Sequence, residues 1–419
     1  MKIYMLILDG AADRKISLLD NKTPLEFART PALSQLVARG SQCMIDVIGE
    51  DIIPESDSGA MALLSYSPQL YYPGRGTLEG IGTGCIPPEC YYAAFRVNFG
   101  SYNSETGFLD RRTSRGLSEE ELQSLSSAIN HSVDLSKFNV NFKLIAFGHH
   151  RGILCIYSRH QLLSGNVSNT DPGFQKKGVW GVPINNANMI PSICVALDDT
   201  LASDQTAKII NEFEIQVHNI LVNHPVNKLR VSQGKLPANY LLLRDGGNPP
   251  KNMPAFRKLY NKSLVMFGQL PAEKAIADLI GEKFIYSKSL DLQLDEKFLT
   301  DMSKCIKDTD EDIVFIHIKG PDEPGHDNKP MDKVMAIEVI DKFFIEPLVN
   351  SLNSDDIVIV TCDHATPCEL KLHSNDKVPL LISGGNISVD STIAFNEKEA
   401  SSGMLKIKKG IDILPYILH

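Results

Sequence analysis

Carboxylate and imidazole side chains that follow short apolar runs are the residues best suited to chemistry in this sequence. Asp322 and His326 form a D-x-x-x-H pair, Asp363 and His364 are adjacent, and His373 follows them. Such ligands suit a borderline divalent ion such as manganese, zinc or cobalt, and together they are too many for one tetrahedral site. Any one of these residues is better explained as a helix cap or a buried histidine. Their recurrence at successive strand ends nevertheless favours a site for two metal ions.

A serine precedes a predicted helix and could act as a nucleophile. The segment PESDSGAMALLSY places Ser56, Asp57 and Ser58 directly before the apolar run at residues 60–64. Backbone amides at the start of a helix stabilise a phosphate attached there, and coordination to a metal would favour the serine alkoxide. On this segment alone a helix-capping serine is the simpler explanation. The predicted metal ligands are what make catalysis by a serine worth proposing.

The apolar runs that carry these residues predict buried strands. They show no polar alternation, which is typical of a parallel sheet covered by helices on both faces, and they occupy residues 3–8, 313–318, 357–360 and 378–382. Between them, apolar residues recur at helical spacing. Thr30 and Pro31 begin one such helix, and a second contains Val334, Ile337 and Ile340. The alternation predicts an α/β fold.

The chain is expected to form two domains, the second inserted into the first. Catalytic groups in open α/β sheets collect beyond the carboxyl ends of the strands. Asp9 follows the first apolar run, whereas Asp322 and the other candidate ligands lie near the opposite end of the chain, so one sheet must contain both. Glycine and proline clusters at residues 74–88 and 246–250 suit linkers. We therefore expect a metal domain at residues 1–85 and 257–419, and an insert at residues 86–256.

The glycine-rich run GRGTLEGIGTG could suggest a dinucleotide-binding site. It lacks the strand before it and the helix after it that such a site requires, since Pro87 and Pro88 follow almost directly. We interpret it as turn and linker.

Length and composition exclude several classes of protein. The chain has 419 residues, 43% of them hydrophobic and 22% charged, which is typical of a two-domain globular protein. Its formal net charge of -9 argues against nucleic acid or an anionic membrane as a partner. No apolar stretch approaches the ~20 residues of a membrane span, and the 8 cysteines form no C-x-x-C pair. We expect reduced thiols and a cytoplasmic location, with the oligomeric state left open.

Several segments, taken in order, resemble one enzyme family. They are ILDGAAD, KTPLE, TPAL, ESDSGAMALLSYSP, YYPGRGTLEG, DRRTSRG, GKLPANYLLLRDGG, HIKGPDEPGHD, TCDHATPC and KLHSNDKVPLLISGG. Spread over nearly the whole chain, they are similar to the archaeal-type cofactor-independent phosphoglycerate mutases, a branch of the alkaline phosphatase superfamily. The resemblance implies an alkaline-phosphatase-like sheet sandwiched by helices and interrupted by a smaller inserted α/β lid domain. It also implies interconversion of 3-phosphoglycerate and 2-phosphoglycerate through a phosphoserine, in glycolysis or gluconeogenesis, without bisphosphoglycerate.

The same resemblance assigns roles to individual residues. Ser56 becomes the phosphoryl acceptor beside two divalent ions. Manganese is the metal expected at this site, and cobalt, zinc and magnesium are the alternatives. One ion is held by Asp9, Ser56, Asp363 and His364, and the other by Asp322, His326 and His373. The substrate is bound by Arg111, Arg115, His150, Arg151, Asp171, Arg244 and Lys274. Either His150 or Asp171 handles the proton of the substrate hydroxyl.

The same residues are compatible with roles other than those of a mutase. Arg111 and Arg115 would equally suit a solvated face paired with the glutamates at residues 119–121, and Lys274 would suit an exposed helix position. A hydrolase of the same superfamily would need the same metals and nucleophile but would let water take the phosphoryl group. A catalytically silent protein that binds metal or phosphate is the third alternative.

Overall fold

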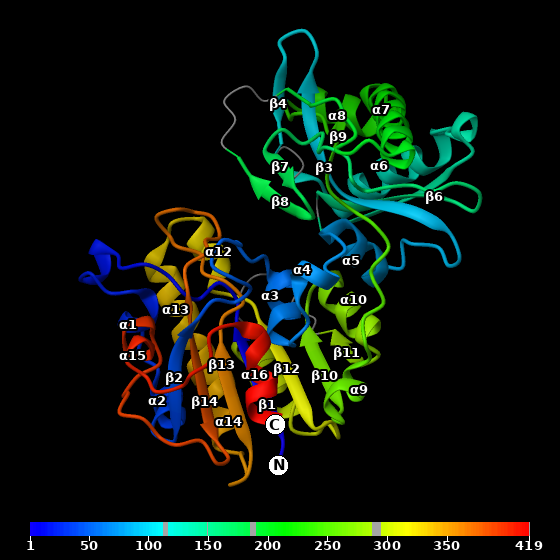
Figure 1. Cartoon of the computed structure of the whole chain (residues 1–419). Helices are drawn as coiled ribbons and strands as arrows, with labels where there is room; N and C mark the ends of the chain where they lie inside the picture. Colours follow the sequence, from blue (N-terminus) through cyan, green and yellow to red (C-terminus); the bar gives the residue numbers. More distant parts are fainter. Residues whose placement is uncertain (112–115, 149, 185–189, 287–294, 419) are drawn as a thin grey trace. The chain divides into compact units, whose positions relative to one another are not determined.

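The computed structural model describes residues 1–111, 116–148, 150–184, 190–286 and 295–418, which form two units. The terminal unit comprises Met1–Tyr71 and Asn252–His419, and the inserted unit comprises Tyr72–Lys251 (Figure 1). Both ends of the chain therefore belong to one unit.

A seven-stranded sheet forms the centre of the terminal unit. Its order is β11 (Lys283–Tyr286), β10 (Leu264–Gly268), β12 (Ile313–Ile318), β1 (Ile3–Leu8), β13 (Ile357–Thr361), β14 (Val378–Gly384) and β2 (Gly40–Ile45). The first five strands are parallel, and β14 is antiparallel to both of its neighbours. The predicted α/β class is thus confirmed, but the expectation that residues 378–382 join a parallel sheet is wrong. Residues 362–377 contain no crossover helix, so the strand returns in the opposite direction.

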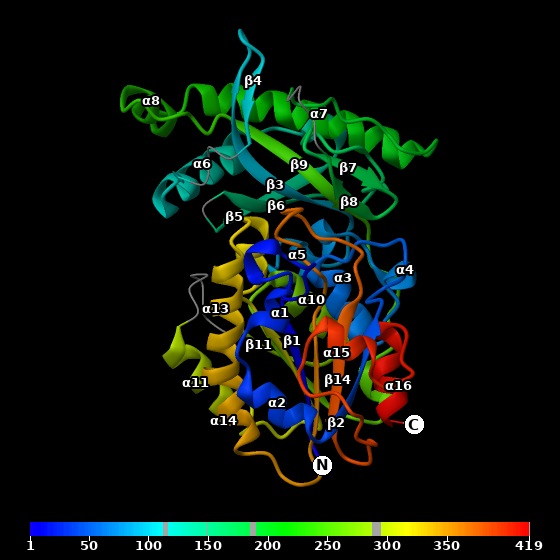
Figure 2. The same ribbon diagram turned by 90° about the vertical axis from the view of Figure 1, so that its left-hand side faces the viewer.

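Helices cover both faces of this sheet, with α13 and α14 along one face and α16 along the other (Figure 2). Because of this cover, every residue of β1 and β12 is buried. The helices of the terminal unit are α1 (Pro24–Phe27), α2 (Pro31–Val37), α3 (Ser56–Leu63), α4 (Pro68–Tyr71), α9 (Phe256–Tyr260), α10 (Pro271–Ile280), α11 (Glu296–Cys305), α12 (Asp322–His326), α13 (Pro330–Ile340), α14 (Glu346–Val349), α15 (Glu397–Ser401) and α16 (Ile413–Leu418).

The inserted unit is built on an antiparallel sheet. Its strands are β3 (Tyr91–Asn103), β4 (Phe108–Asp110), β5 (Asn141–Phe147), β6 (Arg151–Ser158) and β9 (Tyr240–Gly247), with a separate hairpin of β7 (Phe174–Lys177) and β8 (Trp180–Pro183). Its helices are α5 (Arg75–Gly82), α6 (Glu119–Ser132), α7 (Leu201–Val222) and α8 (Pro225–Ser232). Apolar side chains of the sheet and of α6 and α7 form its core, including Phe95, Leu122, Leu154 and Phe213.

The boundaries between the units differ from those expected at residues 85 and 256, because the glycine-rich run is not a linker. Residues 75–82 form α5, which packs directly on the backbone of β3 and β9. A Cβ atom built on Gly76 would lie only 2.3 Å from the carbonyl oxygen of Ala94 and 2.7 Å from that of Asp245. The glycine is needed for this close helix–sheet contact. The interpretation of the run as turn and linker is therefore wrong.

Two further features bear on the expectations from composition. None of the helices in the described part of the chain combines the length and apolar character that crossing a membrane requires. All eight cysteines carry free thiols.

Candidate metal centre and serine nucleophile

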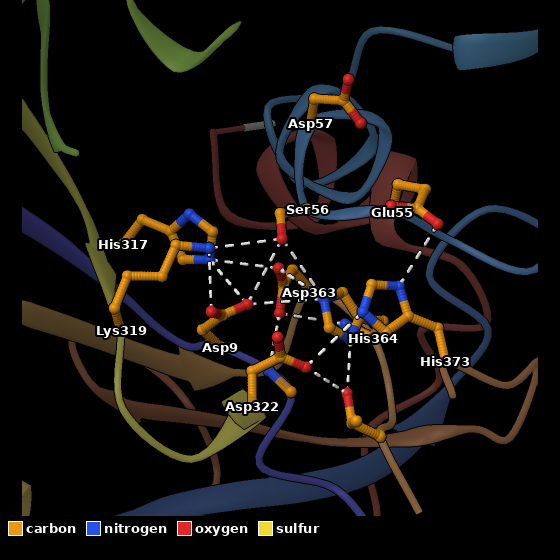
Figure 3. A network of polar contacts seen from close by, with 12 residues as sticks. Asp9, Glu55, Ser56, Asp57, His317, Lys319, Asp322, Asp363, His364 and His373 are labelled. Atoms are coloured by element: carbon orange, nitrogen blue, oxygen red, sulfur yellow. Dashed lines mark hydrogen bonds and ion pairs between the residues drawn. The ribbon is translucent and has the colours of Figure 1, made fainter. Parts of the chain in front are cut away.

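The polar cluster of the terminal unit lies beyond the carboxyl ends of three adjacent strands. Ile3 of β1 is paired in register with the first residues of both β12 and β13. The segments that follow these strands therefore leave the sheet at the same edge, and they carry Asp9, Asp322 and Asp363. The structure brings together all seven residues that the resemblance assigns to metal binding. Figure 3 shows Asp9, Ser56, Asp322, Asp363, His364 and His373. The Nε2 atom of His326 lies 3.4 Å from Asp322 Oδ2 and 3.1 Å from His373 Nε2.

One group of potential ligand atoms comes from Asp9, His317 and Asp363, which are all buried and lie within 4.8 Å of one another. The Nε2 atom of His317 is 3.1 Å from Asp363 Oδ2 and 3.5 Å from Asp9 Oδ1. Ser56 adjoins this group, since its Oγ atom is 3.4 Å from Asp9 Oδ1. The group offers the mixture of oxygen and nitrogen donors that manganese, cobalt and zinc accept.

A second group comes from Asp322, His364 and His373. The Nε2 atom of His373 is 3.5 Å from Asp322 Oδ1 and 3.1 Å from His326 Nε2. The rings of His364 and His373 stack with their centroids 3.8 Å apart. His364 connects the two groups, because its Nε2 atom is also 3.4 Å from Asp9 Oδ1.

Orphaned polar atoms show that this donor set fits divalent cations. Buried polar atoms in proteins nearly always have a hydrogen-bond partner. Here His317 Nε2, Asp363 Oδ2 and His373 Nδ1 are buried without one, although His373 Nδ1 lies 3.5 Å from Glu55 Oε1. Carboxylates and imidazoles that converge without directed hydrogen bonds are arranged as ligands of a cation would be.

The electrostatics of the cluster keep its carboxylates ionised. Burial raises the pKa of Asp9, but Lys319 together with the adjacent imidazoles of His317 and His364 outweighs burial and holds the pKa well below its usual range. For Asp322, burial and the charge of Asp9 are likewise outweighed, chiefly by hydrogen bonds from two histidines, so its pKa is also well below its usual value. Metal ligation requires this deprotonated state.

Ser56 is the first residue of α3, and its hydroxyl points into the cluster. Its Oγ atom is 3.3 Å from both His364 Nε2 and Lys319 Nζ. Ser58 has a different role, because its hydroxyl donates to the carbonyl of Glu55 at 3.1 Å and accepts the Glu55 amide at 3.0 Å. Of the two serines at this helix start, Ser56 alone contacts the cluster.

Sequence reasoning missed several residues of the cluster. His317 interrupts the apolar run of β12, Lys319 follows that strand directly, and both contact Asp9. Glu273 of α10 is fully buried against His317 Nδ1. Thr366 donates to Asp322 Oδ1 at 2.6 Å. A polar residue within an otherwise apolar strand was the one signal of His317 in the sequence.

Three of the predicted substrate-binding residues meet within the inserted unit. Arg111 forms a bidentate pair with Asp171, with 2.7 Å between Nη2 and Oδ2. The guanidinium groups of Arg111 and Arg244 lie 5.1 Å and 3.8 Å from the ring centre of Phe174. Burial, followed by the charge of Arg96, lowers the pKa of Arg244 to about 10. This cluster of cations could hold an anionic group.

The other predicted substrate-binding residues are placed differently. His150 and Arg151 lie together at the start of β6, where the His150 carbonyl accepts the amide of Phe99 at 3.1 Å. Arg115 lies outside the described residues. Lys274 belongs to the terminal unit, where its side chain is 43% exposed and pairs with Asp278 at 2.6 Å. The structure therefore does not bring Lys274 into the polar cluster.

The fold and the site define an α/β protein with a candidate centre for divalent cations beside a serine at a helix start. Comparison with known proteins narrows this class. The family described as 2,3-bisphosphoglycerate-independent phosphoglycerate mutase matches residues 38–227. The mutase of that name from Methanoculleus marisnigri is 36% identical, in a match that spans 100% of this chain and 96% of that protein. The one from Aeropyrum pernix is 34% identical and spans 100% and 99%.

Two solved structures are similar along nearly their whole length. A cofactor-independent phosphoglycerate mutase from Thermoplasma acidophilum has a TM-score of 0.62 at 27% identity, over 99% of this chain and 98% of that one. A protein from Pyrococcus horikoshii has a TM-score of 0.79 at 28% identity, over 100% and 96%. The chain belongs to the 2,3-bisphosphoglycerate-independent phosphoglycerate mutase family. It is therefore an isomerase, and the family resemblance inferred from the sequence is confirmed.

Proposed function

We propose that this chain interconverts 3-phosphoglycerate and 2-phosphoglycerate through a phosphoserine at Ser56, with two divalent ions and without bisphosphoglycerate. One observation carries the proposal. The Ser56 hydroxyl is buried at the start of α3 and is surrounded by Asp9 Oδ1, His364 Nε2 and Lys319 Nζ at 3.3–3.4 Å. A buried serine has no structural need of such neighbours, whereas a nucleophile that accepts a phosphoryl group does.

The residues that would hold the ions are those that the resemblance assigns to them. Asp9, Ser56, Asp363 and His364 would hold one ion, and Asp322, His326 and His373 the other; His364, whose Nε2 atom lies 3.4 Å from Asp9 Oδ1, would then belong with Asp9 rather than with Asp322. When bound, divalent ions would neutralise the charge of the phosphoryl group and favour the ionised serine hydroxyl. Manganese suits this donor set, and cobalt, zinc and magnesium are the alternatives to test.

The transfer itself requires two displacements. Ser56 Oγ attacks the phosphorus in line, and the bond between phosphorus and the glycerate oxygen breaks as the new bond forms. The released glycerate oxygen takes up a proton. The other glycerate hydroxyl then loses its proton and attacks the phosphoserine, which restores Ser56. Lys319 Nζ, 3.3 Å from Ser56 Oγ, compensates negative charge on that oxygen throughout.

We propose that the inserted unit holds the glycerate part of the substrate. The residues in question are Arg111, Arg115, His150, Arg151, Asp171 and Arg244, with Lys274 of the terminal unit as a further contact. Arg244 has the best support. Its guanidinium is buried, and its Nε atom lies 3.7 Å from Asp245 Oδ2 but has no hydrogen-bond partner among the described residues, so a substrate carboxylate could accept from it. His150 and Asp171 remain the alternatives for the proton transfers.

A coupled assay tests the activity. The protein is given 3-phosphoglycerate, manganese and enolase but no bisphosphoglycerate, and phosphoenolpyruvate and free phosphate are measured together. The proposal predicts phosphoenolpyruvate. Free phosphate in its place would indicate the hydrolase, and manganese binding without either product would indicate the silent protein.

The nucleophile is tested separately by comparing Ser56→Ala with Ser58→Ala. Ser56→Ala should abolish both turnover and the transfer of labelled phosphate to the protein. Ser58→Ala removes only a cap, with a stability cost of roughly 1 kcal/mol, and should still form the phosphoenzyme. Labelling that persists in Ser56→Ala would show that another residue accepts the phosphoryl group.

A further inference from the structure

His317 is a polar residue near the carboxyl end of β12, an inner strand of the seven-stranded sheet. It belongs to β12, whose other residues are all apolar, and its side chain is fully buried. Its Nδ1 atom contacts the carboxylate of Glu273, a residue of α10 whose side chain is also fully buried. An imidazole and a carboxylate are costly to bury, so both groups need a partner of complementary charge.

The opposite ring nitrogen of His317 faces the ligand groups. Nε2 lies 3.1 Å from Asp363 Oδ2 and 3.5 Å from Asp9 Oδ1, yet neither Nε2 nor Asp363 Oδ2 has a hydrogen-bond partner. A protonated histidine bound to Asp363 by an ion pair would aim its N–H at the carboxylate oxygen. The observed atoms are close together but not aimed at each other, which is how separate ligands of one ion are arranged.

The charges around His317 also call for a cation. Three carboxylates, those of Asp9, Asp363 and Glu273, lie about its ring. Lys319 Nζ, 2.8 Å from Asp9 Oδ2, compensates one of them. With the neutral His317 ring that metal ligation requires, two negative charges remain, and a divalent ion would compensate both.

We propose that His317 is an additional ligand, through Nε2, of the ion held by Asp9 and Asp363, and that Glu273 orients it by accepting the proton of Nδ1. Metal-binding histidines commonly donate their second ring nitrogen to a carboxylate, which fixes the tautomer and the ring orientation. The inference rests on the proposed two-metal function and extends it to two residues that no strand-end pattern includes.

The test measures manganese binding without turnover. Free Mn²⁺ is followed by its electron paramagnetic resonance signal as the metal-free protein is titrated, for the wild type, His317→Gln and Glu273→Gln. His317→Gln should weaken binding of one of the two ions by at least about 100-fold, and Glu273→Gln by about 10–100-fold, with the other ion unchanged. Asp278→Asn, which changes an exposed carboxylate of the same helix to an amide, is the matched control and should bind manganese as the wild type does.

The outcomes separate this inference from the proposed function. A wild type that binds no manganese would overturn both. A wild type that binds two ions, together with a His317→Gln variant that binds both with unchanged affinity, would overturn only the role of His317. Thermal unfolding of the metal-free variants shows whether they fold. If His317→Gln does not fold, Glu273→Gln, which keeps the side-chain volume, provides the test. In cobalt-loaded protein, His317→Gln should also change the visible absorption of one ion.

Discussion

Lys333 should be among the residues on which the stability of the terminal unit depends most. It lies on α13 with a fully buried side chain, and its ammonium is 2.8 Å from Asp13 Oδ2. It also donates to the carbonyls of Ala12 at 3.2 Å and Thr366 at 2.9 Å. These contacts connect α13 with the segments that follow β1 and β13, both of which carry proposed metal ligands. We predict that Lys333→Met, which keeps the length but removes the charge, strongly destabilises the metal-free protein.

The loss of unfolding free energy in Lys333→Met can be estimated from the polar groups that stay buried without their partner. Asp13 would lose the ammonium and keep only the backbone amides of Arg14 and Cys368 as donors to its carboxylate. Removing one partner of a buried ion pair costs about 3–5 kcal/mol. Two carbonyl acceptors would also lose a donor, at about 1–3 kcal/mol each where no water replaces it. These costs overlap, so we expect a loss of about 3–5 kcal/mol, a large share of the roughly 5–15 kcal/mol that stabilises a typical protein.

Urea unfolding followed by circular dichroism measures this loss. Lys329→Met is the matched control, because Lys329 pairs with Asp327 at 3.3 Å on the surface and is 57% exposed. The control should lose less than about 1 kcal/mol. Combining Asp13→Asn with Lys333→Met should recover part of the loss, since no charge then stays buried. A loss for Lys333→Met no larger than that of the control would refute the reasoning.

Two further predictions concern metal and pH. Dialysis against EDTA should abolish turnover and lower the melting temperature, and manganese should restore both, since the carboxylates then regain a cation; full activity with no bound metal would contradict the two-metal proposal. Burial raises the pKa of Glu214 on α7 to about 8, although Thr170 donates to it. Since the folded state then holds a proton that the unfolded chain releases near pH 4.5, stability should fall as pH rises from about 5 to 8. In Glu214→Gln, the free energy of unfolding should depend less on pH over this range. A pH dependence equal to that of the wild type would contradict the prediction.

How much of the fold the sequence predicts depends on how each element is buried. Strands β1 and β12 begin and end where their apolar runs do, because both are covered on two faces. Strand β2 escaped prediction because it contains Ser41 and Gln42, which are buried although their side chains are polar. The Gln42 amide donates to Thr392 Oγ1 at 2.7 Å and to the Ala394 carbonyl at 3.0 Å. Partners so distant in sequence cannot be inferred from a local pattern.

The candidate site likewise contains residues that could be predicted from the sequence and residues that could not. Residues such as Asp363 and His364 were predictable because the end of a parallel strand is a defined place, and residues that follow adjacent strands must meet there. Glu273 and Lys274 show where that reasoning fails. The resemblance assigned Lys274 to the substrate, but successive residues of a helix point about 100° apart.

The positions of Glu273 and Lys274 around the axis of α10 determine which of the two side chains is buried. Its buried positions include Ala272, Ile276, Ala277 and Ile280, and Glu273 lies on the same face three and four residues before two of them. Lys274 belongs to the opposite face, where it pairs with Asp278. A glutamate within an apolar helix stripe and a histidine within an apolar strand each carry a cost that packing alone does not repay. Such interruptions of an apolar pattern were the signals in this sequence that pointed to Glu273 and His317.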